Sequence, residues 1–277
     1  DKIFGEHIDF TKAGDKRFVA TDEEKIRIAI ILISAKANIF LLIEGPTSSA
    51  KTYSVLIAFN IFITTNFYKT MQKALYPNSK GKTPKNIILR INLSEDSSRE
   101  DFVGSIVYDD SINRFIFKQG AFSKAFEYGY WLLIDELSLA PPSVLQAIEA
   151  ALDIKLLIVQ GLGGTREIKM HPNFFVICTT NPNNEDYSRF ILSSQFLDRF
   201  HKIYFDNLSN KELERIMIEK CQRKNIDDQI QKVNEAHKMY TGPSGPRCKN
   251  MYTLRELDRA CILFERNFHY DYERIID

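Results

Sequence analysis

The chain has 277 residues, enough for one large domain or two smaller ones with a substantial apolar core. Its 37 Lys and Arg residues balance 36 Asp and Glu residues, so the net charge of +1 does not indicate the basic surface typical of nucleic-acid or membrane binding. The four cysteines have neither C-x-x-C spacing nor histidine partners at metal-ligand spacing: Cys178, Cys221, Cys248 and Cys261. This pattern argues against a disulfide framework or a zinc site and favours reduced thiols in the cytosol or nucleus.

No segment of the sequence is suited to cross a bilayer. The longest apolar run, residues 26–37, is broken by Arg27, Ser34 and Lys36 and falls short of the roughly 20 residues that a spanning helix needs. The chain begins with Asp1 and not with Met, which leaves open that it belongs to a longer protein.

Short apolar segments alternate with helical patterns along the first two thirds of the chain. This alternation predicts an α/β fold with a parallel sheet that helices cover on both faces. The five expected strands are residues 39–44, 86–92, 131–135, 174–179 and 202–205. A helix is expected over residues 141–154, where apolar residues recur on one face.

Two β-hairpins and a change of composition interrupt this alternation. The hairpins are expected at residues 104–118 and 155–170, with turns at 109–113 and 161–164. After Asp206 the sequence becomes helical and strongly charged. We therefore expect two domains: an α/β domain over residues 1–207 and a small helical lid over residues 208–277.

The first strand runs into a loop that fits the phosphate-binding pattern G-x-x-x-x-G-K-[ST], except for an alanine in place of the second glycine. The loop consists of Gly45, Pro46, Thr47, Ser48, Ser49, Ala50, Lys51 and Thr52. Backbone N–H groups of such a loop and of the helix that follows it point at nucleotide phosphates. Lys51 would reach the terminal phosphates, and the Thr52 hydroxyl would bind Mg²⁺. The alternative is a polar turn before a core helix.

Two further strands end in polar side chains, at the sheet edge where open α/β folds bind ligands. Asp135 and Glu136 follow the third strand: Asp135 would hold Mg²⁺, and Glu136 would orient and deprotonate an attacking water. Asn181 follows the fourth strand and could hydrogen-bond both a terminal phosphate and that water. Asn92 ends the second strand and could hold Glu136 away from water. The alternatives are ordinary loop acids and turn asparagines.

Two arginines are candidates for stabilising the transition state. Arg199 lies just before the fifth strand and could act on the phosphates of a neighbouring copy. Arg255 begins an amphipathic helix in the expected lid and could reach the phosphates from above. A surface ion pair and a solvated helix face are the respective alternatives.

The order of these motifs resembles the AAA+ ATPases, from about Phe18 onward. The two hairpins are similar to those of the branch that has inserts in its second helix and before sensor 1, which includes dynein, MoxR-type and midasin ATPases. Within this branch the likeness is greatest to midasin modules, on residues 45–52, 90–93, 129–141 and 171–174. The resemblance implies a five-stranded sheet of order 5-1-4-3-2.

The resemblance also implies the roles of the site residues and the cofactors ATP and Mg²⁺. By this likeness Lys51 and Thr52 are Walker A contacts, Asp135 and Glu136 the Walker B pair, Asn181 sensor 1, Arg199 the arginine finger and Arg255 sensor 2. The implied partners are neighbouring AAA+ modules in a six-membered ring and a protein or ribonucleoprotein substrate. For a midasin-like module this means assembly of the large ribosomal subunit, in the nucleus or nucleolus.

Two stretches depart from the family pattern. The connector over residues 66–85 is longer than expected, and residues 183–190 replace a glycine-rich segment after sensor 1. They bear on which member of the family the chain resembles and not on the superfamily. Two other functions also stay open: a ring module that binds nucleotide without hydrolysing it, and a GTP-driven nucleic-acid translocase similar to the GTPase subunit of McrBC-type systems.

Overall fold

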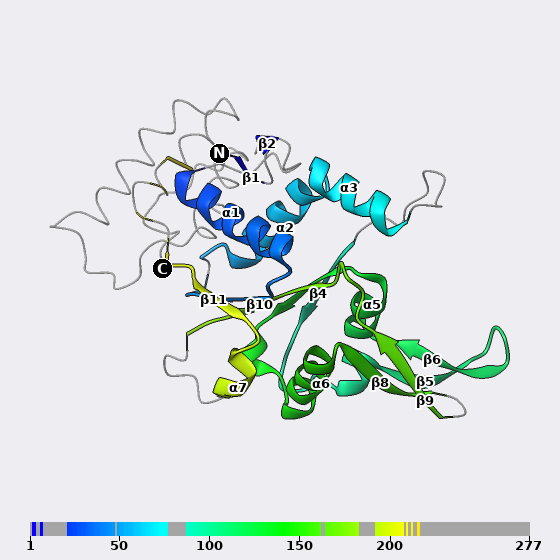
Figure 1. Ribbon diagram of the computed structural model, residues 1–277. Helices are drawn as coiled ribbons and strands as arrows, with labels where there is room; N and C mark the ends of the chain where they lie inside the picture. The colour runs from blue at the N-terminus through cyan, green and yellow to red at the C-terminus, as the bar shows by residue number, and fades with distance from the viewer. Residues whose placement is uncertain are drawn as a thin grey trace, which may run out of the picture.

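The structure is a computed structural model that describes residues 2–3, 6–7, 21–47, 49–76, 87–161, 164–182, 192–207, 209, 212 and 215–216. Its centre is a parallel sheet of five strands (Figure 1). The strands are β3 (Leu41–Glu44), β4 (Ile88–Asn92), β7 (Trp131–Asp135), β10 (Phe175–Thr180) and β11 (His201–Tyr204). Their order in the sheet is β11-β3-β10-β7-β4, which is 5-1-4-3-2 when they are counted along the chain. The α/β fold with a five-stranded parallel sheet, predicted from the alternation of apolar segments, is confirmed.

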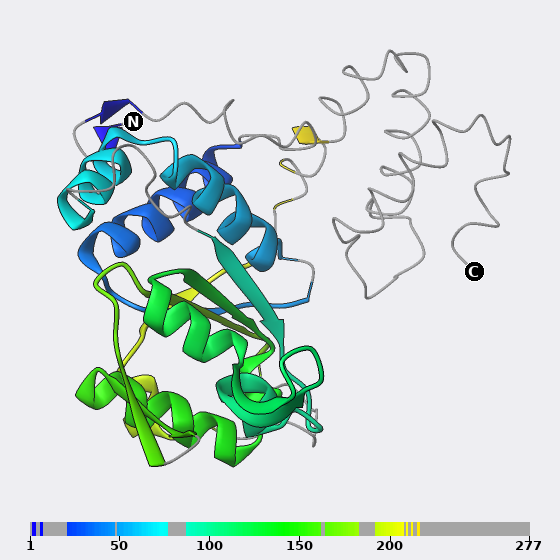
Figure 2. The same cartoon turned by 90° about the vertical axis from the view of Figure 1, so that its right-hand side faces the viewer.

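Helices cover both faces of this sheet (Figure 2). One layer contains α1 (Asp22–Ala37), α2 (Lys51–Phe62) and α3 (Asn66–Leu75). The opposite side contains α4 (Arg99–Val103), α5 (Ala121–Tyr128), the 3₁₀ turn η2 (Leu137–Leu139), α6 (Pro142–Ile154) and α7 (Ser194–Leu197). Both faces of the sheet are therefore shielded, as its apolar strands require.

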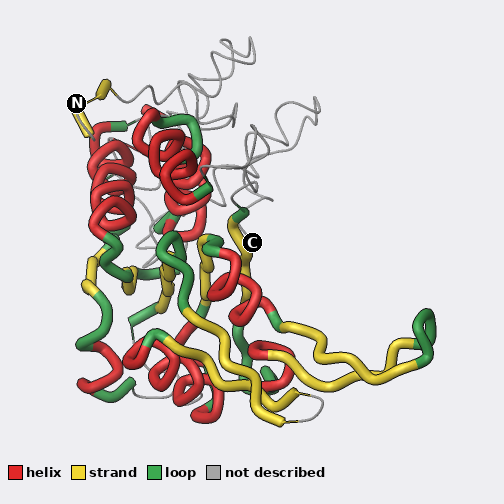
Figure 3. The backbone as a smooth tube through the Cα atoms, turned by 45° about the vertical axis from the view of Figure 1, so that its right-hand side comes forward, coloured by secondary structure: helices red, strands yellow, loops and turns green. Residues whose placement is uncertain are grey.

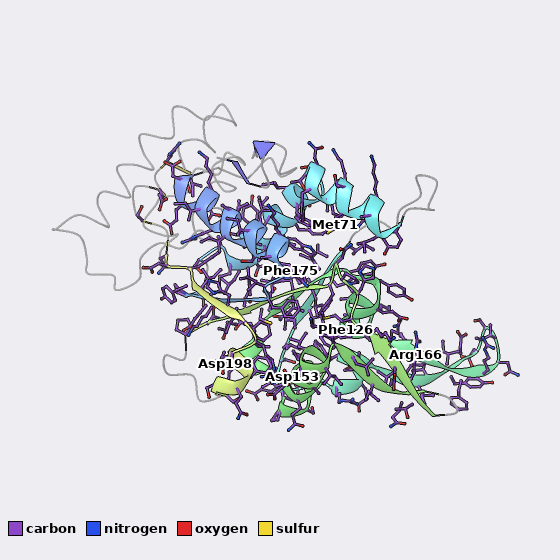
Figure 4. The ribbon with its side chains drawn as sticks, in the orientation of Figure 1. Met71, Phe126, Asp153, Arg166, Phe175 and Asp198 are labelled. Carbon is purple, nitrogen blue, oxygen red and sulfur yellow. The ribbon has the colours of Figure 1, made fainter. Side chains whose placement is uncertain are left out.

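The core is divided between the two faces because successive side chains of a strand point to opposite sides. In β7, Trp131 and Leu133 pack in the cluster beneath α1 and α2, whereas Leu132 pairs with the cluster around α5 and α6. Figure 4 labels one aromatic residue from each cluster, Phe175 of β10 and Phe126 of α5. The alternation thus anchors one sheet to two separate helical layers.

The segment after α2 forms a helix that sequence reasoning took for part of a connector. The Thr65 side chain accepts a hydrogen bond from the N–H of Tyr68, which caps the first turn of α3. The rings of Phe67 and Tyr68 pack against Phe62 at the end of α2. The expected connector over residues 66–85 is therefore helical in its first half, and residues 77–86 lie outside the described part of the chain.

Three two-stranded antiparallel pairs accompany the sheet. Two strands near the start of the chain, β1 (Lys2–Ile3) and β2 (Glu6–His7), pair with each other. The expected hairpins are formed by β5 (Gly104–Asp109) with β6 (Arg114–Gln119), and by β8 (Leu156–Gly161) with β9 (Gly164–Lys169). Figure 3 shows that the β5–β6 hairpin projects well beyond the body of the domain.

Among the described residues, no helix has both the length and the apolar character needed to span a membrane. The expected lid, residues 208–277, lies almost entirely outside the described part of the chain.

Candidate nucleotide-binding site

The phosphate loop leaves β3 through a glycine that nothing larger could replace without movement. The N–H of Gly45 donates to the carbonyl oxygen of Thr180, 3.2 Å away. A Cβ atom at Gly45 would lie 2.1 Å from the carbonyl oxygen of Phe205, far inside van der Waals contact. The first glycine of the pattern is therefore needed for close approach of the loop to the chain that follows β11.

The alanine that replaces the second glycine has a left-handed backbone. Ala50 precedes the first residue of α2 and has φ of 63° and ψ of 17°. This region costs an L-residue roughly 1–2 kcal/mol and is open to glycine. The conformation explains why the pattern usually has glycine here, and it shows that alanine can still form the turn.

The ammonium group of Lys51 is turned inward onto its own loop. Nζ donates to the carbonyl oxygens of Gly45 at 2.6 Å and Pro46 at 2.8 Å, and to Oδ1 of Asn181 at 2.8 Å. Lys51 is almost fully buried. The first residue of α2 and the residue after β10 thus meet at the carboxyl edge of the sheet.

The carboxylate of Asp135 is bound by three side chains. Its Oδ1 accepts from the hydroxyls of Thr52 and Thr179, each at 2.9 Å. Its Oδ2 accepts from Nε of Arg90 at 2.6 Å. Thr52 and Asp135, which were expected to share a Mg²⁺ ion, are therefore adjacent. Carboxylate and hydroxyl oxygens are ligands that suit this ion, directly or through its waters.

The neighbouring acid, Glu136, faces the same centre. Its Oε1 accepts from Nδ2 of Asn181 at 2.8 Å, so the Asn181 amide connects Glu136 to Lys51. Among the described residues, the buried Oε2 of Glu136 has no hydrogen-bond partner. The backbone of Glu136 is also left-handed, with φ of 58°. A buried carboxylate oxygen without a donor and a strained backbone are both typical of functional sites.

Asn92 does not take the part expected of it. It lies beside Asp135 in the strand register and is exposed. Within the described residues, the hydrogen bond to the Glu136 carboxylate comes from Asn181 and not from Asn92.

Sequence reasoning missed three residues of this region. Arg90 and Thr179 bind Asp135, and the available signals were a charge within the apolar strand β4 and a polar residue near the end of β10. The third is Arg27, the charge that interrupts the apolar run of α1.

Arg27 joins the back of the phosphate loop to the chain after β11. Its guanidinium donates to the carbonyl oxygens of Ser49 at 3.0 Å and Asp206 at 2.7 Å, and lies 4.8 Å from the centre of the Phe205 ring. The side chain is only 5% exposed. Beside it, burial raises the pKa of Glu24 above its usual value. Arg27 therefore fixes the loop relative to the segment that leads toward the expected lid.

Of the two candidate arginines, Arg199 pairs with acids of α6 and not with the residues of this cluster. Arg199 binds both carboxylate oxygens of Asp153 on α6, at 2.6 Å each, and Glu149 at 3.0 Å. Hydrogen bonding to Asp153 raises the pKa of Arg199. Figure 4 shows Asp153 and Asp198, the residue before Arg199, at the same end of the domain. Arg255 lies outside the described residues.

Fold and site together define a phosphate-loop α/β domain, with an acidic pair and a polar sensor at the carboxyl edge of the sheet. The pattern of the AAA domain, dynein-related subfamily, matches residues 41–200, and the chain belongs to this family. The match begins at β3 and runs through the loop, the acidic pair and Asn181 to the residue before β11.

Two relatives support this assignment, and a solved structure shares the fold. The chain is 32% identical to midasin from Dictyostelium discoideum over 70% of its own length and 3% of that protein. It is 27% identical to midasin from Giardia intestinalis over 79% of its length and 4% of that protein. The chain thus spans only a small part of both relatives. A crystal structure from Cytophaga hutchinsonii, described as a "putative ATPase", shares the fold with a TM-score of 0.52 at 22% identity, covering 83% of this chain and 62% of that one.

Proposed function

We propose that the chain is an AAA+ module that binds ATP with Mg²⁺ and hydrolyses it at the interface with a neighbouring module. The observation that carries this proposal is the meeting of Lys51, Asn181 and Glu136 in one chain of hydrogen bonds, with Thr52 and Asp135 alongside. These residues follow three different strands. The fold brings them together at the carboxyl edge of the sheet, where open α/β folds bind ligands.

The residues divide the work by their chemistry. Backbone N–H groups at the start of α2 bind phosphate oxygens, and Lys51 exchanges the carbonyls of Gly45 and Pro46 for phosphate. Thr52 and Asp135 hold Mg²⁺, which neutralises phosphate charge when bound. Glu136 takes a proton from the attacking water through Oε2, which has no hydrogen-bond partner among the described residues, while Asn181 keeps the carboxylate in place. The loop residues Thr47, Ser48 and Ser49 complete the cradle.

The finer roles extend beyond the domain itself. Arg199 serves the site of the adjacent module, because it is far from the nucleotide site of its own chain. Arg255 and the lid, residues 208–277, close over the nucleotide. The likeness to midasin supports a six-membered ring that remodels a protein or ribonucleoprotein assembly, with assembly of the large ribosomal subunit as the specific case and the nucleus as its location.

The test is the rate of ATP hydrolysis per chain as protein concentration is raised, with GTP and the variant Glu136→Gln as controls. We expect the rate per chain to climb with concentration, to favour ATP, and to fall by about 10²-fold or more in Glu136→Gln while ATP still binds. Tight ATP binding with no turnover at any concentration would instead indicate the non-hydrolysing ring module. Preference for GTP would favour the nucleic-acid translocase.

A further inference from the structure

Arg90 and Thr179 are the residues of the Asp135 cluster that the family likeness and the proposed chemistry leave without a role, and Arg90 is the charged one of the two. Arg90 lies in the middle of the edge strand β4, opposite Leu133 of β7, and its Nε donates to Oδ2 of Asp135 at 2.6 Å. Asp135 is 5% exposed at its side chain, whereas Arg90 is 55% exposed. A half-solvated cation is thus paired with a buried anion.

Arg90 compensates the buried charge of Asp135 when no nucleotide is bound. A buried carboxylate is costly unless a cation or several donors compensate it. Two neutral hydroxyls bind Oδ1, and Arg90 supplies the positive charge at Oδ2. Lys51, the other cation nearby, donates to Gly45, Pro46 and Asn181. Among the described residues, the ion-pair partner of Asp135 is Arg90 alone.

The same carboxylate is where the proposed function places Mg²⁺. A divalent ion and a guanidinium repel each other, and both would draw on the charge of Asp135. Arg90 is free to leave, because β4 is an edge strand and more than half of the side chain is in solvent. An exposed arginine loses little when its guanidinium moves into water.

We propose that Arg90 is a positioning residue that takes the place of Mg²⁺ at Asp135 when no metal is bound, and that the arriving metal displaces it. The inference rests on the proposed ATP site. In the metal-free state Arg90 keeps the Asp135 carboxylate oriented beside Thr52. Metal binding therefore moves the Arg90 side chain at the edge strand β4.

The proposal predicts opposite effects on metal binding and on metal-free nucleotide binding. In Arg90→Gln the competitor is gone, so Mn²⁺ should bind more tightly in the presence of a non-hydrolysable ATP analogue, by about threefold to tenfold. ATP binding in EDTA should weaken, because the charge of Asp135 then faces the phosphates uncompensated. A purely structural residue would weaken both.

The measurement is a Mn²⁺ titration followed by electron paramagnetic resonance, with the same analogue at saturation, beside fluorescent-nucleotide binding in EDTA. Arg166→Gln is the matched control, since Arg166 of β9 forms an exposed ion pair with Glu127 of α5 and should change neither value. Arg90→Lys keeps the charge and should lie between wild type and Arg90→Gln. Equal Mn²⁺ affinities in wild type and Arg90→Gln, or weaker binding in both assays, would overturn the proposal.

A second measurement needs no substitution. The side-chain Nε–Hε resonance of Arg90 in wild-type protein should differ between ATP in EDTA and ATP with Mg²⁺, as the bond to Asp135 breaks. An unchanged resonance on metal binding would contradict displacement. If the protein binds ATP and Mn²⁺ but does not hydrolyse ATP, the proposed ATPase function is contradicted. The binding measurements on wild type and Arg90→Gln would still test the role of Arg90.

Discussion

Two positions of the phosphate loop, Gly45 and Ala50, are constrained by backbone geometry. Gly45 is fixed by its closeness to Phe205, and Ala50 occupies a left-handed turn that suits glycine. At Gly45 any side chain would clash, whereas at Ala50 the alanine fits but its backbone is strained. A substitution by glycine can relieve the strain at Ala50, so this position can be tested by measurement.

Replacing Ala50 with glycine should stabilise the folded chain. Glycine adopts φ near 63° without the contact between Cβ and the following carbonyl, although it also gains freedom in the unfolded chain. We expect Ala50→Gly to raise the free energy of unfolding by up to about 1 kcal/mol, measured by urea denaturation with an unchanged m value. The control Ala35→Gly, inside α1, should lower it by about 1 kcal/mol. Destabilisation by both changes would show that Ala50 is not strained.

At the scale of elements, the strands were the most predictable part of the fold. Each expected strand overlaps an observed one, with ends that differ by no more than two residues, because uniformly apolar runs between polar turns leave few other interpretations. Asp135, Glu136 and Asn181 could be placed for the same reason, since parallel strands end at one edge of the sheet. Their roles remain predictions.

Contacts between elements could not be read in this way. The bond from Arg90 to Asp135 depends on the register of β4 against β7, and the bond from Arg27 to Ser49 depends on how α1 packs behind the loop. Long-range geometry of this kind leaves no periodic trace in the sequence. Helix α3 is a different case, because apolar residues recur every four positions from Phe67 to Leu75, so a helical pattern was present in the sequence.

The end of α3 is connected to the segment before β10 through His171, and this contact should respond to pH. The hydroxyl of Tyr76 lies 3.1 Å from Nε2 of His171, and the N–H of Asn173 lies 3.1 Å from Nδ1. Burial lowers the pKa of His171 below its usual 6.5. As pH falls through this value, the unfolded chain binds a proton before the folded chain does, so stability is lost.

We therefore expect the free energy of unfolding to fall between about pH 7 and pH 5, and part of this slope to disappear in His171→Gln. Chemical denaturation across this pH range is the measurement. Tyr76→Phe serves as the control, because it removes the hydroxyl and keeps the histidine, so its slope should stay close to that of wild type. Parallel curves for wild type and His171→Gln would exclude His171 as the source.

At the scale of the whole molecule, the candidate site and Arg199 lie at opposite ends of the strands of the parallel sheet. The site follows the carboxyl ends of β3, β7 and β10, whereas Arg199 comes before His201, the first residue of β11. His201 aligns with Leu41 at the start of β3, and Tyr204 aligns with Glu44 at its end. At about 3.3 Å per residue the strands separate Arg199 from its own loop by roughly 10 Å or more. In a head-to-tail contact between two modules, Arg199 of one module would reach the nucleotide site of the next. Only a heterologous interface joins two different surfaces of the same module in this way.

Mixing two inactive variants tests this arrangement. Glu136→Gln lacks the base and should lose about 10²-fold or more in turnover. Arg199→Ala lacks the arginine and should lose about 10³-fold or more. In an equal mixture that exchanges freely, about one interface in four joins an intact Glu136 to an intact neighbouring Arg199, so about a quarter of wild-type activity should return. If Arg199 acted within its own chain, the mixture would stay inactive. A mixture of wild type with the double variant provides the control, because it should give about a quarter of the activity when the two residues act between chains and about a half when they act within one chain.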